Sequence, residues 1–248
     1  MAYNETALVA AIDRLLAGAA APDDLDQFHI GGADAVDKLI ASLALSPGDR
    51  VLDVGSGFGG PARQIARRGY RVTGLDITPA YVEAARHLTP PGLVDFQVGD
   101  IASLRASPPF QAAITMHVQM SVRSKTAWYT GIRRALAPGG RLAMWEVCQP
   151  GSGPVRWPMP WSMDGADSFL VSAETLVDQV ADAGFGAGEW VNESGWVRSW
   201  IETTFADGPP PGPALPMLLD DGYTRVLNFV AAITDGTLEI WRGCFPAP

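Results

Sequence analysis

The chain has little basic charge and almost no lysine. Eighteen of its 248 residues are Lys or Arg, only two of these are Lys, and the formal net charge is -9 at pH 7. The absence of a basic block argues against binding along a nucleic-acid backbone or an anionic membrane. No apolar run approaches the roughly 18 residues of a membrane span, and no basic segment precedes the apolar stretch near residue 10. These absences predict a cytoplasmic protein that acts on small molecules.

Cysteine is scarce too. Cys148 and Cys244 are too few for a disulfide framework and lack the C-x-x-C spacing of metal or redox sites. We therefore expect no metal site, and we expect both cysteines in the core. The rest of the composition, 47% hydrophobic and 18% charged, is enough to bury a sizeable core in a globular protein.

Strand and helix patterns alternate along the first 147 residues. Helical spacing of apolar residues predicts helices at 34–45, 61–69, 78–88 and 125–137, the third one capped by Thr78. Apolar runs predict strands at 50–54, 71–77, 94–100, 110–116 and 140–147, with a turn at 137–140. This order predicts an α/β fold, a doubly wound parallel sheet with right-handed crossovers.

The composition changes after Glu146. A loop rich in Pro, Gly and Trp occupies 148–165, and an amphipathic helix capped by Ser172 follows it. Beyond a strand near 188–191 comes a variable stretch through the proline run. A helix at about 223–233 and a strand at 237–245 then close the chain.

The glycine loop after the first strand is compatible with two cofactors. Gly55, Gly57 and Gly60 satisfy the dinucleotide fingerprint G-x-G-x-x-G, whereas Gly55, Gly57 and Gly59 form the G-x-G-x-G loop of S-adenosylmethionine (SAM) methyltransferases. Either loop places backbone N–H groups and a positive helix end beside the ligand. Asp76, about 20 residues further on, can accept hydrogen bonds from both ribose hydroxyls. Both cofactors remain open on these residues.

Two acidic residues favour SAM. Asp53 places a carboxylate where the dinucleotide fingerprint is normally apolar, and where SAM presents ammonium and sulfonium charge. At the third strand's end, Asp100 can bind an adenine amino group while Ile101 packs on the ring. The alternatives are that Asp53 caps amides of the loop and that Asp100 caps a helix.

With these motifs, the sequence resembles class I SAM-dependent methyltransferases, and within them the sarcosine/dimethylglycine and phosphoethanolamine N-methyltransferase-like group. Residues 26–32, 51–63, 72–78, 117–121 with Lys125, 136–147 and 158–172 carry the resemblance. It implies a seven-stranded sheet with an antiparallel last strand, an N-terminal helical lid at 1–33, a SAM-binding core at 34–147, and a substrate-pocket insertion with closing strands at 148–248. It also implies a SAM site lined by Gln27, Gly55, Gly57, Asp76, Ile77, Asp100, Ile101 and His117, to which the loop adds Asp53 and Gly59.

His117 is the catalytic candidate. It follows the fourth strand, where it acts either as a general base or only as a contact to the adenosine or a loop. The candidates for substrate binding are His29, Met120, Trp157, Trp161 and Trp196, with ordinary core packing as the alternative for each aromatic residue. Met120-Ser121 departs from the Met-Asn that is usual in the group.

We therefore predict a SAM-dependent methyltransferase with a small-molecule acceptor, either a ring-bearing bacterial metabolite or a small amine. The target atom, N, O or C, is left open, as is the oligomeric state. A SAM-binding protein of the same fold without methyl transfer, such as a cyclase, is the alternative. An NAD-dependent oxidoreductase is a remote one, because the chain has no Tyr-x-x-x-Lys set. No nucleic-acid or membrane partner is expected.

Overall fold

The structure, a computed structural model, describes residues 27, 29–105, 109–206 and 219–248. The helix expected within the first 26 residues, and with it most of the proposed lid, lies outside the described residues. None of the helices described is both long and apolar enough to cross a membrane.

A seven-stranded sheet forms the centre of the molecule, with strand order β3-β2-β1-β4-β5-β7-β6. The strands β1 to β5 run parallel, whereas β7 is antiparallel to both β5 and β6. The predicted sheet with an antiparallel last strand is confirmed. The strands are β1 (Arg50–Val54), β2 (Arg71–Asp76), β3 (Val94–Val98), β4 (Phe110–Met116), β5 (Leu136–Cys148), β6 (Glu189–Asn192) and β7 (Glu239–Pro246).

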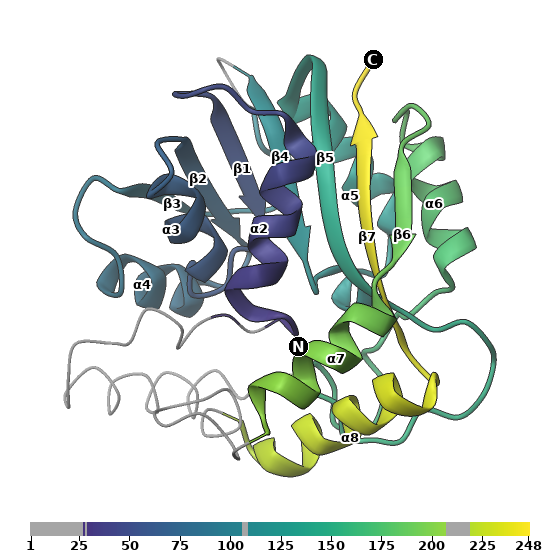
Figure 1. Cartoon of the computed structure of the whole chain (residues 1–248). Coiled ribbons are helices and arrows are strands. Elements are labelled where there is room, and N and C mark those ends of the chain that lie inside the picture. Colours follow the sequence, from purple (N-terminus) through teal and green to yellow (C-terminus); the bar gives the residue numbers. More distant parts are fainter. Residues whose placement is uncertain (1–26, 28, 106–108, 207–218) are drawn as a thin grey trace.

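Helices cover both faces of the sheet (Figure 1). Successive side chains of a strand point to opposite faces, so Val51 and Leu52 of β1 enter two different buried clusters. The first cluster packs under α2 (Gly32–Leu43), α3 (Gly60–Ala66) and α4 (Pro79–His87), and the second under α5 (Lys125–Ala135) and α6 (Ala173–Asp182). The sequence between Val51 and Val54 is apolar apart from Asp53 because both faces are covered.

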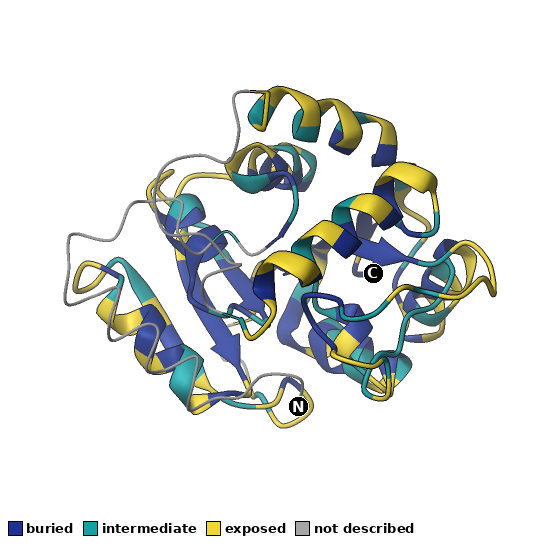
Figure 2. Ribbon diagram, turned by 90° about the horizontal axis from the view of Figure 1, so that it is seen from below, coloured by how far each residue is buried: buried dark blue, intermediate teal, exposed yellow. Residues whose placement is uncertain are grey.

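The order of the strands defines where a ligand can bind. The chain leaves β1 toward β2 on one side and returns through β4 on the other, so β1 and β4 are neighbours at a topological switch point. Beyond the carboxyl ends of the parallel strands lie α7 (Ser194–Thr204) and α8 (Gly222–Asp235) (Figure 1). Seen from this end, the helices turn their exposed faces outward and the strands between them are buried (Figure 2).

Three local predictions need correction. The segment 137–140 is not only a turn: β5 already pairs at Leu136, and the residues up to Arg141 form an irregularity opposite β4. Thr78 precedes α4 but makes no side-chain cap bond, because its hydroxyl bonds Asp76 instead. Helix α7 was not expected. Ser172, by contrast, caps α6 by accepting a hydrogen bond from the Thr175 amide, as predicted.

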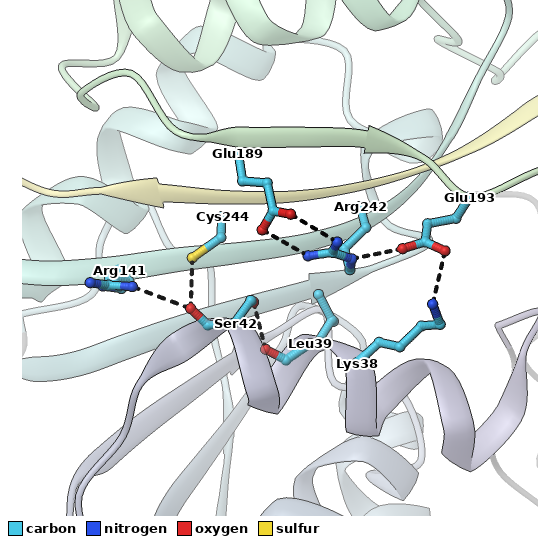
Figure 3. Close-up of polar contacts among 8 residues, drawn as sticks. All are labelled: Lys38, Leu39, Ser42, Arg141, Glu189, Glu193, Arg242 and Cys244. Atoms are coloured by element: carbon cyan, nitrogen blue, oxygen red, sulfur yellow. Dashed lines mark hydrogen bonds and ion pairs between the residues drawn. The ribbon is translucent and has the colours of Figure 1, made fainter.

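An ion-pair network fastens α2 to the antiparallel edge of the sheet (Figure 3). The Arg242 guanidinium of β7 lies 3.1 Å from a Glu189 oxygen and 2.8 Å from Glu193 Oε1. Glu193 Oε2 in turn accepts a hydrogen bond of 3.0 Å from Lys38 Nζ of α2. Glu193 directly precedes α7, so the same network also sets where that helix begins.

Candidate functional site

The glycine loop is built from three glycines with different surroundings. A Cβ at Gly55 would lie 2.6 Å from the Val118 side chain, and one at Gly59 would lie 2.3 Å from the Phe96 ring. These two positions are glycine because neighbouring side chains approach closely. At Gly57, where φ is 52°, a Cβ would meet no heavy atom within 4 Å. Gly57 is therefore the open position of the loop, whereas Gly59 allows the close approach of Phe96, and its predicted cofactor contact stays a prediction.

Asp76 holds this loop in place. Its Oδ2 accepts a hydrogen bond of 2.9 Å from the Gly57 amide, and its Oδ1 accepts one of 2.9 Å from the Thr78 amide. Burial raises the pKa of the Asp76 carboxyl, and the two amides act in the opposite direction. The Thr78 hydroxyl and the Ile77 amide also donate to this carboxylate, so a ribose hydroxyl would have to share or replace one of these contacts. The ribose contact stays a prediction.

Asp53 is a buried carboxylate with an unusual environment. Only 2% of the residue is exposed, and Oδ2 has no hydrogen-bond partner within the described part of the chain. Burial, followed by the nearby Asp76, raises the pKa of Asp53 to about 7, while a hydrogen bond from the Ala62 amide opposes the shift. Both predicted roles therefore have support: Asp53 caps an amide of α3 and also keeps an unsatisfied oxygen.

The other predicted SAM contacts are divided between surface and core. Ile77 is 67% exposed at the end of β2, as a ring-stacking side chain requires. Asp100 is exposed, but its Oδ1 accepts a hydrogen bond of 2.9 Å from the Ala102 amide, which is the capping alternative. Ile101 is only 2% exposed and belongs to the core cluster that contains Tyr129. The structure places the Ile101 side chain in the core, and its packing on adenine stays a prediction.

Gln27 is the first described residue. Its side-chain NH₂ donates a hydrogen bond of 3.2 Å to Gln64 Oε1 of α3, the helix that follows the glycine loop. Gln27 Oε1 is buried and unpartnered among the residues described. Gln27 thus contacts the helix that follows the glycine loop, and its place in the SAM site stays a prediction.

His117 lies at the end of β4 in a left-handed conformation, with φ of 54°. Its Nε2 is buried and meets no hydrogen-bond partner in the described ranges. Burial, and then the neighbouring His29, lowers the pKa of His117 well below its ordinary value. The imidazole is therefore neutral at neutral pH and can accept a proton at one nitrogen.

Aromatic rings extend from His117 in a series of edge-to-face contacts. The His117 ring lies 6.2 Å from the His29 ring and 5.8 Å from the Phe229 ring of α8. The Trp161 ring lies 5.5 Å from Phe229 and 6.5 Å from Trp157. The structure therefore brings together the predicted residues His29, His117, Trp157 and Trp161. Phe229, which completes the series, was missed because nothing in its helical pattern separates it from an ordinary core residue.

The proline-rich loop that carries these tryptophans is fixed to α8 by polar contacts. Arg225 donates through Nε to the Met159 carbonyl at 2.8 Å and through Nη2 to the Pro160 carbonyl at 2.9 Å. Asn228 donates to the Pro158 carbonyl at 2.9 Å. Both side chains are on one face of α8, three residues apart, and both are buried. Sequence reasoning missed them, although a polar pair at this spacing in an apolar helix was a usable signal.

Two predicted substrate-binding residues, Trp196 and Met120, lie outside the ring series. Trp196 of α7 packs edge-to-face on Trp145 of β5 at 5.7 Å, with Lys38 Nζ 4.6 Å from the ring centre. It joins α7 to α2 and the sheet and is not part of the ring series. Met120 is buried in the same cluster as Trp161, and its carbonyl accepts a hydrogen bond of 2.7 Å from the Phe169 amide. Met120 therefore supports the loop, and its substrate contact stays a prediction.

The chain is similar in sequence and in fold to known SAM-dependent enzymes. Residues 51–140 match the family model described as "Methyltransferase domain". A SAM-dependent Diels-Alderase of Talaromyces variabilis is 36% identical over 118 residues, which make up 45% of this chain and 40% of that protein. The chain thus spans less than half the length of this curated relative.

Two solved structures share the fold over nearly the whole chain. The cyclase SpnF has a TM-score of 0.68 and 23% identity, covering 100% of this chain and 97% of SpnF. Phosphoethanolamine N-methyltransferase 2 of Haemonchus contortus has a TM-score of 0.69 and 20% identity, covering 97% of this chain and 57% of that one. Residues 51–140 thus match a methyltransferase domain, and the chain has the Rossmann-like fold of these solved structures.

Proposed function

We propose that this protein is a SAM-dependent methyltransferase with a small-molecule acceptor. The observation that carries the proposal is the pair Asp53 and Asp76, two buried carboxylates beside the open glycine of a loop at the switch point of the sheet. Asp76 adds to the cost of ionising the buried Asp53, and such a site favours a ligand that brings positive charge. SAM carries an ammonium and a sulfonium group.

The same pair argues against the dinucleotide alternative. A pyrophosphate would bring two further negative charges toward Asp53, whose Oδ2 has no compensating donor among the described residues. The cost of adding negative charge to a buried acidic site is large because the local dielectric is low. NAD is therefore the less favourable ligand for this loop.

The residues that would hold SAM are those at the carboxyl ends of β1 and β2. Asp76 would bind the ribose hydroxyls, Gly57 leaves room for the nucleoside, and Ile77 offers an exposed apolar face to the base. Asp53 would face the cationic end. When bound, SAM supplies an electrophilic methyl group. The chain has to align the acceptor with that group and exclude water, which alone can lower a barrier by several kcal/mol.

His117 is the group placed to receive the acceptor's proton. Its unpartnered Nε2 lies in the ring series, at the end of the strand next to the glycine loop. Neutral imidazole can accept a proton from an N–H or O–H group. His29, 6.2 Å away by ring centres, donates its Nε2–H to the Gly32 carbonyl at 2.9 Å and is thereby oriented.

The acceptor we propose bears a ring and is largely apolar. Phe229, Trp161 and Trp157 extend from His117 in edge-to-face contacts, and aromatic side chains recognise flat apolar groups. A small amine is the second choice. It is supported by the fold shared with phosphoethanolamine N-methyltransferase 2, which also supports the finer placement in that N-methyltransferase-like group.

A cyclase that binds SAM without transferring its methyl group is the second candidate function. It is favoured by the similarity to a SAM-dependent Diels-Alderase and to the cyclase SpnF. An apolar ring-lined site that holds a substrate in one conformation would suit both reactions.

The decisive experiment has two stages. The first compares the thermal midpoint of the full chain with S-adenosylhomocysteine (SAH) and with NADH; stabilisation by SAH alone is expected, and stabilisation by NADH alone would refute the proposal. The second supplies methyl-labelled SAM with a panel of phenols, polyketide-like rings and small amines. Label in an acceptor confirms methyl transfer. SAH binding without label in any acceptor, together with conversion of a ring precursor, would favour the cyclase.

A further inference from the structure

The turn after β4 is fastened to β5 residue by residue. His117 donates its backbone N–H to the Trp145 carbonyl at 2.9 Å. The Gln119 side chain donates to the Val147 carbonyl. Between these two contacts lies Glu146, so three consecutive residues of β5 bind three consecutive residues of the turn.

Glu146 makes the central contacts of this arrangement. Its Oε2 accepts hydrogen bonds from the Val118 amide at 3.0 Å and from the Gln119 amide at 3.2 Å. The residue is completely buried at the carboxyl end of β5. Hydrogen bonds from amides to a carboxylate are stronger than those between neutral groups. A single side chain thus satisfies two backbone donors that directly follow His117.

The conformation of His117 requires such support. Its φ of 54° is in the left-handed region, which a residue with a Cβ adopts only when its surroundings fix it. The Trp145 and Glu146 contacts hold the backbone on both sides of the imidazole. Without these two contacts the turn could relax, and the His117 imidazole would rotate away from His29 and Phe229.

The same turn also contacts the glycine loop. The Val118 side chain lies so close to Gly55 that a Cβ there would be 2.6 Å from Val118 Cγ2. Glu146 therefore fixes the Val118 amide, and the Val118 side chain packs closely against Gly55 of the glycine loop. Val118, which directly follows His117, therefore links the turn to Gly55 of the glycine loop.

The environment of Glu146 is polar but not solvated. Burial raises the pKa of Glu146 to about 7, while hydrogen bonds from Thr115 and the two amides, and the Lys125 charge, act in the opposite direction. Lys125 of α5 donates to the Val122 carbonyl at 2.8 Å and also to the Phe169 carbonyl. A buried acid is costly to keep, and in this one Oε2 bonds the turn while Oε1 has no hydrogen-bond partner among the described residues.

We propose that Glu146 is a positioning residue, which holds His117 toward the acceptor and Val118 against Gly55 and so couples the two halves of the site. This inference rests on the proposed function. Glu146 touches neither ligand and acts only through the turn, so its loss should alter the rate and cofactor affinity more than acceptor binding.

The test compares Glu146→Gln, which keeps a carbonyl oxygen able to accept both amides, with Glu146→Leu, which removes the acceptor. For Glu146→Leu we expect SAH affinity to fall about fivefold or more and kcat about thirtyfold or more, with the acceptor KM within about threefold of wild type. Glu146→Gln should restore both quantities to within about threefold of wild type. In ¹H–¹⁵N spectra, the Val118 and Gln119 amides should shift upfield in Glu146→Leu.

The matched control is Glu193→Leu, because Glu193 is also a buried glutamate with hydrogen bonds but serves the α2 and β7 network. It should lose stability and keep its SAH affinity and kcat. Equal losses of SAH affinity and kcat in Glu193→Leu and Glu146→Leu, or wild-type values in Glu146→Leu, would overturn the inference.

Three further outcomes bear on this inference and on the proposed function. If Glu146→Leu does not fold, Val118→Ala decides: it keeps the carboxylate and should weaken SAH binding about threefold or more, and unchanged affinity would overturn the coupling. A wild-type protein that binds SAH but transfers no methyl group would refute the transferase, whereas the affinity measurements would still test Glu146. A wild-type protein that binds no SAH would refute both.

Discussion

Replacing Gly57 by Ala separates backbone strain from ligand exclusion at the glycine loop. An alanine in the left-handed region costs about 1–2 kcal/mol. For a chain of this size, about 1 kcal/mol shifts the thermal midpoint by about 2–4 °C, so the variant should melt about 2–8 °C lower. The new methyl group meets no protein atom within 4 Å. Any additional effect must therefore come from the ligand.

The ligand effect can be calculated from binding linkage. At 100 times its Kd, SAH adds about 2.7 kcal/mol to wild-type stability, or about 5–11 °C. If the methyl group weakens SAH binding about tenfold, the same concentration adds only about 1.4 kcal/mol, or about 3–6 °C, and calorimetry should give the tenfold change directly.

Gly139→Ala is the matched control for this variant. Gly139 also has a positive φ, of 76°, and open space around its Cβ position, but it lies near the amino end of β5, in the irregular part between the pairs at Leu136 and Arg141. It should melt lower by a similar amount and keep the full SAH shift. Wild-type SAH affinity in Gly57→Ala, or an equal loss in Gly139→Ala, would refute the placement of the ligand over Gly57.

Three other predictions concern single side chains. Asp76→Ala should weaken SAH binding by about 1–3 kcal/mol, the usual cost of losing hydrogen bonds to an ionised group, as measured by calorimetry against wild type. The pKa of Asp53, raised to about 7, means that the folded protein holds a proton which the unfolded chain releases near pH 4. Its contribution therefore lowers stability as pH rises from about 4 to 7, and Asp53→Asn should flatten this part of the pH–stability curve and weaken binding of SAM more than of SAH. Trp161→Phe should raise the acceptor KM about fivefold and leave the SAM KM unchanged, whereas Trp196→Phe should only lower the thermal midpoint; equal effects of the two on the acceptor KM would contradict the ring series.

The fold could be predicted from the sequence because its strands are bounded by strong local signals. β1 and β4 begin and end at the expected residues, since each is an apolar run enclosed by turn residues or a charged loop. Helix α7 was missed although Trp196, Val197, Trp200 and Ile201 recur at helical spacing, which was a usable signal in the sequence. The start of β5 escaped because Gly139 and Gly140 indicate a turn, while pairing with β4 and a hydrogen bond to Ala247 decide the strand.

The site could be predicted where it depends on backbone motifs and not where it depends on tertiary contacts. Asp53, Gly57 and Asp76 meet because parallel strands end at one edge of the sheet. Spacing could not show that Trp161 joins Phe229 while Trp196 joins Trp145, because each partner comes from a distant element. Glu146 was overlooked, although a single acid within the apolar run LAMWEV was a signal for a buried polar role.

The environment of His117 limits the proton transfer it can perform in the function we propose. Burial and His29 keep its pKa well below the ordinary value, so it is neutral at neutral pH but a weak base. A weak base cannot ionise a phenol or a protonated amine in advance. An acceptor's N–H or O–H proton becomes far more acidic once its heteroatom has begun to form a new bond, and a weak neutral base is then sufficient. His117 therefore suits an acceptor that attacks while still protonated, such as a phenol or a neutral amine, and its buried Nε2 takes up the proton late in the reaction.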